Sequence, residues 1–284
     1  TIIGLNLISY NENKNTIKAN KYVFAMGGIE NSRYLLWFYK KYKDKFIANS
    51  PALGRYWMEH PHFTLGQAIV DKRKVKEKFY SLSAEAQKNM GILNCGFRVL
   101  ELNDTAMKGL LREVLCIAPT LGKSLANLAD RNLICGVKFR AAWEQAPNYA
   151  NRISLDNKRD KFGIPKPVLN WQKKTIDRKT IMKSIEVFNQ WLLEIDGGRI
   201  QLDDWIINEK NYPTNDELAG YHHMGGTRMH VNPEFGVVDK NCKVYGSDNL
   251  YMAGSSVFTT GGHNNPTLPI IQLALRLANH LAGK

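Results

Sequence analysis

Two adjacent histidines, His222 and His223, stand beside a pair of glycines, Gly225 and Gly226, near the C-terminal end of the 284-residue chain. A histidine whose pKa lies near neutrality can take a proton from an alcohol and hold it. Glycine has no side chain, so a planar ring can lie close to the backbone beside it. The pattern indicates proton-transfer chemistry. The alternative is that one imidazole lies in the core and the other at the surface.

Asn265-Pro266 opens the last apolar stretch of the chain. Proline is favoured at the first position of a helix, and asparagine just before it as the cap. The free N–H groups of a helix N-terminus can stabilise an anionic group. Asn265 is therefore either a cap alone or a polar group of a site, and the pattern leaves both open. The expected buried face of this helix consists of Leu268, Ile271, Leu275, Ala278 and Leu281.

Small residues follow two apolar runs, and each place predicts a strand that leads into a tight turn. Residues 22–26 lead into the glycine pair at 27–28, and residues 250–252 lead into Ala-Gly-Ser at 253–255. Small residues at the ends of parallel strands let a ligand or the next helix approach closely. Each turn is therefore either a place for phosphates or a ring, or a plain turn.

Two further histidines, His60 and His62, alternate within a segment rich in proline and glycine at 49–62. They would share one face of an extended chain, as half of a metal site or in local hydrogen bonds. A zinc hydrolase would use four other residues: His222, His223, His230 and Asp239. Adjacent histidines rarely reach one metal together, and no Cys or Glu closes that set at the usual spacing, so we expect no metal.

The rest of the chain predicts strands and helices in alternation. Strands are expected at 2–9, 16–25, 63–70, 95–100 and 133–143, a strand–turn–strand unit at 151–171, and helices at 29–38, 110–129 and 177–195. The middle of the chain is then a mixed sheet with helices, and its two flanks are pieces of a different layer. This order predicts a discontinuous domain with an insertion.

The composition limits the class of protein. The chain carries 39 Lys and Arg against 26 Asp and Glu, a net charge of +13, but the excess is spread out. This predicts a generally basic surface and no nucleic-acid partner. No apolar run approaches the roughly 18–20 residues of a membrane span. The four cysteines have no CxxC spacing, which predicts reduced thiols in a cytoplasmic protein rather than a disulfide frame.

Taken in order, these motifs resemble the glucose–methanol–choline (GMC) family of flavin oxidoreductases. The family pattern His-x-[Val/Met]-Gly-Thr-x-Arg-Met is matched at 222–229 by His-His-Met-Gly-Gly-Thr-Arg-Met. Gly-Val-Val-Asp at 236–239 and Asn-Leu-Tyr-Met-Ala-Gly-Ser-Ser at 249–256 follow, and then Asn-Pro-Thr-Leu at 265–268. Three upstream segments also look like the family: 25–33, 54–62 and 151–171.

The resemblance implies FAD as cofactor and oxidation of a CH–OH group in a small alcohol, sugar or polyol. The electron acceptor stays unknown. In ungapped register the family's catalytic histidine falls on His222, with His223 one position away, and its partner residue falls on Asn265. His222 would accept the hydroxyl proton as hydride passes to the flavin, while Asn265 binds the same oxygen. The resemblance places the cofactor along Ala25, Gly27, Ala253, Gly254, Ser255, Pro266 and Thr267.

The implied fold is α/β (α+β overall) and has two parts. A partial, Rossmann-like FAD-binding domain is made of 1–55 and 216–284. A substrate-binding domain with a mixed, largely antiparallel sheet is inserted at 56–215. The chain lacks the family's G-x-G-x-x-G element, so we expect an incomplete chain, and Gly226 replaces the usual Thr. The alternative is a catalytically incomplete fragment, or a partner subunit that keeps the fold but needs another chain for its phosphate cradle.

Overall fold

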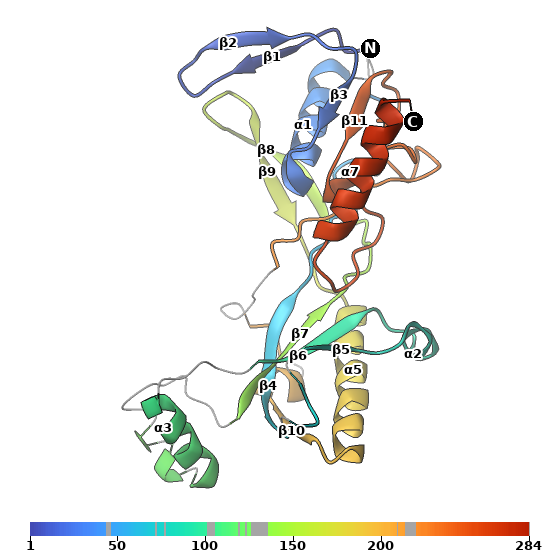
Figure 1. Ribbon diagram of the computed structural model, residues 1–284. Coiled ribbons are helices and arrows are strands. Elements are labelled where there is room, and N and C mark those ends of the chain that lie inside the picture. The colour runs from blue at the N-terminus through green and yellow to red at the C-terminus, as the bar shows by residue number, and fades with distance from the viewer. Residues whose placement is uncertain are drawn as a thin grey trace.

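A computed structural model describes residues 1–43, 47–71, 73–76, 78–100, 106–118, 120–122, 124–125, 136–208, 210–213 and 220–283. Figure 1 shows two lobes, with both chain termini in the upper one. The upper lobe is built from the first and last parts of the chain, and the lower lobe is built around a sheet from its middle.

The lower lobe contains a five-stranded antiparallel sheet. Its strand order is β10 (Gly198–Leu202), β4 (His62–Val70), β7 (Val137–Trp143), β6 (Cys95–Leu100) and β5 (Phe79–Ser81). Alternate residues on β6 and β7 point to opposite faces, as strand geometry requires. Phe97, Val99 and Phe139 are buried on one face, whereas Arg98 on the other face is exposed.

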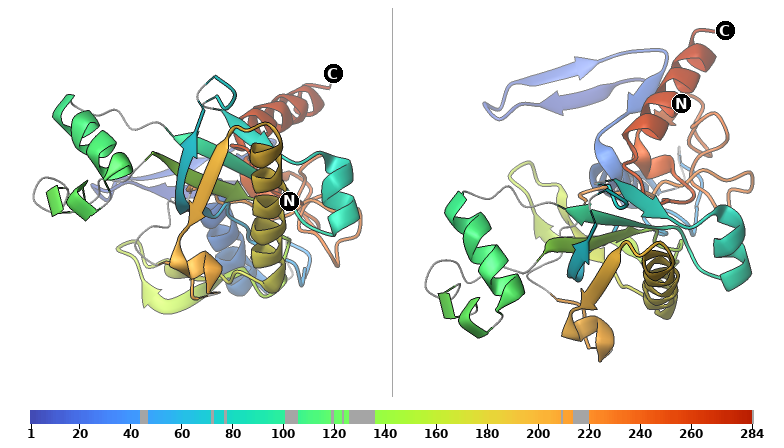
Figure 2. Two further views of the ribbon diagram at one scale, coloured as in Figure 1. Left: turned by 90° about the horizontal axis from the view of Figure 1, so that it is seen from below. Right: turned by 60° about the horizontal axis from the view of Figure 1, so that its bottom comes forward.

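Helix α5 (Thr175–Glu194) covers the apolar face of this sheet, and its Ile181, Ile185, Phe188 and Leu192 repeat at helical spacing in the same core. Two helices lie on opposite sides of the sheet, α2 (Ala84–Met90) and α3 (Ala106–Ile117), as Figure 2 also shows. The short helix α6 (Asp204–Ile207) follows β10.

The upper lobe contains a parallel pair of strands, β3 (Tyr22–Phe24) and β11 (Leu250–Met252). Helix α1 (Gly27–Tyr42) follows β3, the 3-10 helix η2 (Ser255–Val257) follows β11, and α7 (Thr267–Leu281) ends the chain. This parallel pair and its helices are the Rossmann-like part of the fold. Two antiparallel hairpins complete the strands: β1 (Leu5–Ile8) with β2 (Lys14–Ile17), and β8 (Arg152–Arg159) with β9 (Pro165–Asn170).

Each lobe has its own apolar core. One cluster draws its residues from 22–58 and 224–277, and the other from 63–206. The hairpin β8–β9 lies against α1, where the buried Arg33 pairs with Asp160 at 2.6 Å and donates to the Pro165 carbonyl at 2.7 Å. The domain boundaries at 55/56 and 215/216 stay a prediction, and the second lies outside the described residues.

Two predictions about secondary structure are wrong. Residues 16–25 are not one strand: β2 pairs with β1, and β3 leaves the hairpin to join β11. The buried face of α7 is Ile270, Leu273, Leu277 and Leu281, whereas Leu268, Ile271, Leu275 and Ala278 are exposed. Because both faces of α7 are apolar, helical spacing alone does not select the one that packs.

The cysteine prediction also needs correction. Cys95 and Cys242 are free and buried, but Cys116 is disulfide-bonded, and its partner lies outside the described residues. The cytoplasmic location stays a prediction. Among the helices of the described ranges, none is long and apolar enough to cross a membrane.

Candidate active site

Two segments far apart in the sequence run side by side below the predicted histidines. Met58 and Met224 exchange backbone hydrogen bonds of 2.8 and 3.0 Å. Gly225 has a φ of 75°, and a Cβ atom there would lie 2.2 Å from the carbonyl oxygen of Tyr56. Gly225 therefore lets two segments of the chain's own backbone pack closely, and a planar ligand ring beside the glycines stays a prediction.

The side chain of Glu59 fixes the position of the His222 backbone. Glu59 is 2% exposed, and its Oε1 accepts hydrogen bonds from the backbone N–H groups of His222 at 2.8 Å and His60 at 2.9 Å. A carboxylate oxygen that accepts from two backbone donors makes strong, charge-assisted bonds. The two histidine-bearing segments are thus held together by one buried acid.

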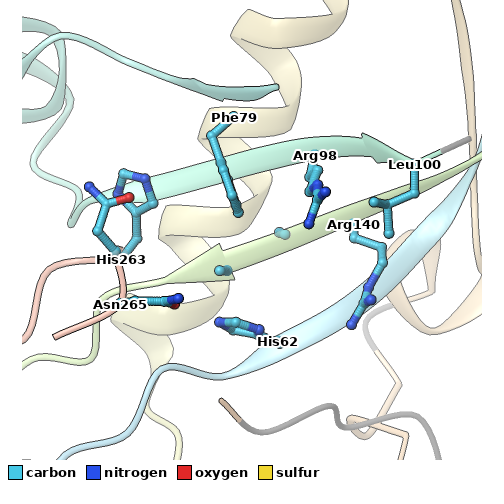
Figure 3. Close-up of a pocket in the computed structure, with 10 residues that line it drawn as sticks. His62, Phe79, Arg98, Leu100, Arg140, His263 and Asn265 are labelled. Atoms are coloured by element: carbon cyan, nitrogen blue, oxygen red, sulfur yellow. The ribbon is translucent and has the colours of Figure 1, made fainter. Parts of the chain in front are cut away.

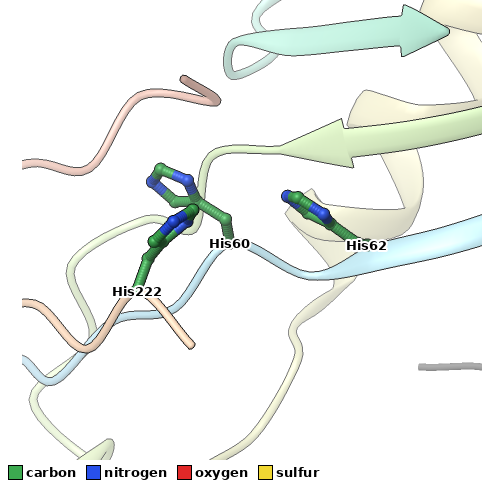
Figure 4. Close-up of side chains that lie close together, drawn as sticks. All are labelled: His60, His62 and His222. Carbon is green, nitrogen blue, oxygen red and sulfur yellow. The ribbon is translucent and has the colours of Figure 1, made fainter. Parts of the chain in front are cut away.

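Three imidazole rings, of His60, His62 and His222, gather above this junction (Figure 4). The ring centre of His222 lies 5.2 Å from that of His60 and 6.3 Å from that of His62. One buried nitrogen of each ring has no hydrogen-bond partner: Nδ1 of His60, Nε2 of His62 and Nδ1 of His222. The three rings have potential ligand atoms within 4.8 Å of one another, so a metal ion is sterically possible here.

The surroundings keep all three rings uncharged at neutral pH. Burial, together with the neighbouring His222, lowers the pKa of both His60 and His62 from 6.5 to about 4. Burial also lowers the pKa of His222, and the adjacent His223 adds to this effect. A neutral imidazole has a free lone pair, so each ring is in the protonation state that can accept a proton.

His223 lies in different surroundings. Its ring centre is 5.4 Å from that of Trp57, and its carbonyl oxygen accepts a hydrogen bond of 2.6 Å from the Ser255 hydroxyl. A Cβ atom at Gly28 would lie 2.6 Å from the same carbonyl oxygen, so α1 packs closely against it. Of the two adjacent histidines, His222 is the one that joins the histidine cluster.

A cavity of about 520 Å³ lies at the junction of the lobes, on the face of the sheet opposite α5 (Figure 3). Its walls are His62, Phe79, Arg98, Leu100, Arg140, Ala141, Ala142, His263, Asn264 and Asn265. Asn265 lines the cavity and His222 does not, but His62 belongs both to the cavity wall and to the histidine cluster.

Asn265 is not the cap of α7. The helix begins at Thr267 with Pro266 at the N-cap, one residue later than predicted, and no side chain caps it. The amide of Asn265 faces the cavity instead. The loop that carries it is tied to the histidine cluster, because Nε2 of His60 lies 3.3 Å from the carbonyl oxygen of Gly261.

The ring of His263 packs directly against strand β6. A Cβ atom at Gly96 of β6 would lie 2.5 Å from Cδ2 of His263, so only glycine leaves room for the ring. His263 is 8% exposed, and burial lowers its pKa. Because position 96 is glycine, the loop before α7 can pack against the sheet, where His263 lines the cavity.

The carboxyl ends of β3 and β11 lie next to each other, since the backbone N–H of Ala253 donates to the Phe24 carbonyl at 2.8 Å. Gly27 and Gly254 follow, with φ of 86° and 94°, and no atom lies within 4 Å of a Cβ built on either. Ala25 is exposed at the same edge. These positions leave open space beside both strand ends, as an extended ligand requires.

The other predicted cofactor residues differ in exposure. The Ser255 hydroxyl is engaged with the His223 carbonyl, Pro266 is buried, and Thr267 is exposed at the first position of α7. The buried Asn31 joins the two strand ends, because it accepts from the Met26 N–H at 3.0 Å and donates to the Ala253 carbonyl at 3.0 Å.

Residues 147–274 match the model of the GMC oxidoreductase family. Over these residues the chain is similar to the GMC oxidoreductases. It is 25% identical over 286 residues to the fructose dehydrogenase large subunit of Gluconobacter japonicus, covering 98% of this chain and 50% of the relative. It is 26% identical over 285 residues to 2-methyl-1,2-propanediol dehydrogenase of Mycolicibacterium austroafricanum, covering 95% of this chain and 49% of the relative.

Solved structures of two oxidases share the fold. Pyridoxine 4-oxidase from Mesorbium loti aligns with a TM-score of 0.63 at 12% identity, over 100% of this chain and 55% of that one. Formate oxidase of Aspergillus oryzae aligns with a TM-score of 0.57 at 16% identity, over 97% and 56%. The chain therefore spans about half the length of the proteins that it matches.

Several residues of this site carried no signal in the sequence. Asn31 and Glu59 stood in family-like segments without a role, and nothing marked Arg98, Arg140 or His263. Their positions depend on contacts between distant segments, such as the bond from His222 to Glu59 across 163 positions. An acidic residue directly before a histidine was the one feature of the sequence that could have drawn attention to Glu59.

Proposed function

We propose that this chain is the catalytic portion of an FAD-dependent oxidoreductase that acts on the CH–OH group of a small alcohol, sugar or polyol. One observation carries the proposal. A neutral His222, anchored by Glu59, belongs to a histidine cluster that reaches the wall of a cavity also lined by Asn265. The cavity volume of about 520 Å³ suits a ligand of sugar size.

The residues present fit FAD at the strand ends. Open space lies beside Gly27 and Gly254, and exposed or half-buried Ala25 and Ala253 flank them. Ser255 would contribute its backbone, and Pro266 and Thr267 would contribute the start of α7. When bound, FAD would supply an acceptor for the hydride of the substrate carbon.

His222 takes the hydroxyl proton in this proposal. Its lone pair is available because its pKa is lowered, and its backbone is fixed, so the ring needs little reorganisation. The Asn265 amide donates a hydrogen bond to the same oxygen and orients it. His62 has an unpartnered Nε2 on the path between the cavity and His222, where it can pass or share the proton.

Half of each matched relative lies outside the aligned region, so the phosphate cradle for FAD would come from further chain or from a partner. One relative is named as a large subunit, which favours a partner subunit among the possibilities. The electron acceptor stays open. The alternative remains a catalytically incomplete fragment or subunit that keeps this fold.

A zinc hydrolase is the third possibility, and its predicted ligands are not brought together. The cluster in the described part of the chain is His60, His62 and His222, which excludes His223, His230 and Asp239. His230 is instead packed against Phe235, with ring centres 5.6 Å apart.

The experiment uses the full-length protein, purified without added cofactor. We expect it to be yellow, with flavin absorption bands that bleach under nitrogen when the right alcohol, sugar or polyol is added. A full-length protein that is colourless and contains stoichiometric zinc would contradict the proposal. A yellow protein that no alcohol bleaches would favour the non-catalytic alternative.

A further inference from the structure

The rings of the histidine cluster, His60, His62 and His222, lie close to the arrangement of a three-ligand metal site (Figure 4). Their potential ligand atoms all lie within 4.8 Å of one another. A zinc ion with Zn–N bonds of about 2.0–2.1 Å needs tetrahedral ligand atoms about 3.4 Å apart. Rotation of the half-buried rings of His62 and His222 would close this difference, because the ring torsion of histidine has a broad range.

Each ring of the cluster also has one buried nitrogen without a hydrogen-bond partner among the described residues: Nδ1 of His60, Nε2 of His62 and Nδ1 of His222. Buried polar atoms normally have a partner, so three such nitrogens in one place need an explanation. In His60 the other ring nitrogen, Nε2, lies 3.3 Å from the carbonyl oxygen of Gly261. When Nε2 donates to this carbonyl, Nδ1 of the neutral ring carries the lone pair, as in a metal-ligating histidine whose second nitrogen is bound to the backbone.

The backbone that carries the three rings is fixed on both sides of the cluster. The Glu59 carboxylate accepts hydrogen bonds from the backbone N–H groups of His60 at 2.9 Å and His222 at 2.8 Å. His62 is the first residue of β4 and is the register partner of Ala142 on β7. Ligands that start from a fixed backbone need little reorganisation to bind an ion.

The donor atoms select the kind of ion. Three imidazole nitrogens suit Zn²⁺ and Cu²⁺, whereas Mg²⁺ and Ca²⁺ prefer oxygen ligands. Three protein ligands leave the fourth tetrahedral position of zinc open. The positive charge of Arg140, which contributes to the lowered pKa of His62, opposes a cation on that side. We therefore expect reversible binding rather than the tight binding of a structural zinc ion.

We propose that His60, His62 and His222 form a binding site for Zn²⁺, and that the bound ion inhibits the oxidation. Only one of the two adjacent histidines belongs to the cluster, so the sequence argument against a metal at the His222–His223 pair does not apply to it. The lone pair with which His222 accepts the hydroxyl proton is occupied when it binds the ion. The binding site rests on the histidine geometry alone, whereas the inhibition rests on the proposed function.

The test uses the full-length, flavin-loaded protein after treatment with a chelator, and Zn²⁺ alone is the probe. Isothermal titration calorimetry should show one Zn²⁺ site per chain and no binding of Mg²⁺. His62→Gln should weaken Zn²⁺ binding at least about tenfold, since even the loss of a residue that only supports a ligand costs about 10–100-fold. His60→Gln should have the same effect, and circular dichroism of each variant checks that it is folded.

His280→Gln is the matched control, because His280 is exposed on α7 and lies outside the cluster. This change should leave the affinity for Zn²⁺ unaltered. In the wild type, Zn²⁺ should slow the reduction of the flavin by a substrate that bleaches it. In His62→Gln, the same fractional slowing should need at least about tenfold more Zn²⁺.

Equal affinity of the wild type and His62→Gln for Zn²⁺ would overturn the inference, and so would equally strong binding of Mg²⁺. The two proposals fail separately. If Zn²⁺ binds through the histidines but no alcohol, sugar or polyol bleaches the flavin, the metal site stands and the oxidoreductase is wrong. If a substrate bleaches the flavin but Zn²⁺ does not bind at the cluster, the metal site is wrong and the oxidoreductase stands. Zn²⁺ that binds through the histidines without slowing flavin reduction would refute the inhibition.

Discussion

Glu59→Ala is the change that most directly tests how the histidine cluster is held. The Glu59 carboxylate is 2% exposed and accepts two short backbone hydrogen bonds, from His60 and His222. The substitution removes the acceptor and leaves both backbone donors unpaired at a buried position. The matched variant Glu59→Gln keeps an amide oxygen of nearly the same shape and can accept the same two bonds.

The size of the effect follows from these contacts. A hydrogen bond to a charged group contributes about 1.5–3 kcal/mol, and the cost of burying the carboxylate itself offsets part of two such bonds. We therefore expect Glu59→Ala to lower the free energy of unfolding by about 2–4 kcal/mol, and Glu59→Gln by less than about 1.5 kcal/mol.

The assay is urea unfolding of the chain at pH 7, followed by tryptophan fluorescence, because Trp57 lies two residues before Glu59 and is 2% exposed. Glu186→Ala serves as a second control, since its ion pair with Lys183 is exposed and should contribute less than about 1 kcal/mol. If Glu59→Ala and Glu59→Gln unfold within 0.5 kcal/mol of each other (about the usual limit of such comparisons), the two backbone bonds do not hold the cluster.

Three further predictions concern the same framework. His60 is fully buried and its pKa is lowered from 6.5 to about 4, so the unfolded chain binds the proton first as the pH falls. The free energy of unfolding should therefore fall between pH 6.5 and pH 4, by about 3 kcal/mol at most for this group. His60→Gln should flatten this dependence of stability on pH, and an unchanged dependence would show that His60 does not cause it. Gly96→Ala should displace the His263 ring and lower the free energy of thermal unfolding by about 1–3 kcal/mol. Gly109→Ala should cost nothing, because no atom lies within 4 Å of a Cβ built there. Equal effects of the two changes would show that the ring of His263 does not pack closely against Gly96. Asp160→Asn should weaken the attachment of β8–β9 to α1 by about 1–3 kcal/mol, because it removes the carboxylate that pairs with the buried Arg33 at 2.6 Å. The rate of amide hydrogen exchange in that hairpin should then rise, and an unaltered rate would contradict the prediction.

Helices and strands were predictable where the residue pattern is compatible with only one type of element and one buried face. Residues 63–70 and 95–100 alternate or run apolar at strand length, and both are strands, β4 and β6. The helix expected at 177–195 is α5, because its apolar spacing selects a single face. In α7 two faces are apolar, and the choice depends on what packs against the helix, which spacing does not contain.

The site was predictable only in part, because its geometry arises between segments that are distant in sequence. The spacing favoured His222 over His223 and placed Asn265 at the start of the last helix, and both stay predictions about catalysis. The glycines at 225–226 were expected to lie beside a ligand ring, which stays a prediction, and the contact of Gly225 with the backbone at Tyr56 was not foreseen. The pairing of Arg98 with Arg140 across β6 and β7 depends on strand register, which the sequence of either strand alone does not specify.

The most direct test of the central claim is the rate of flavin reduction in the full-length protein, measured anaerobically by stopped flow with a substrate that bleaches the wild type. His222→Ala should lower this rate by about 100-fold or more, since a positioned base contributes about 10²–10⁴. His223→Ala should leave much of it, because His223 packs against Trp57 outside the histidine cluster. The reverse result, or equal and small effects of both changes, would contradict the assignment of His222 as the base.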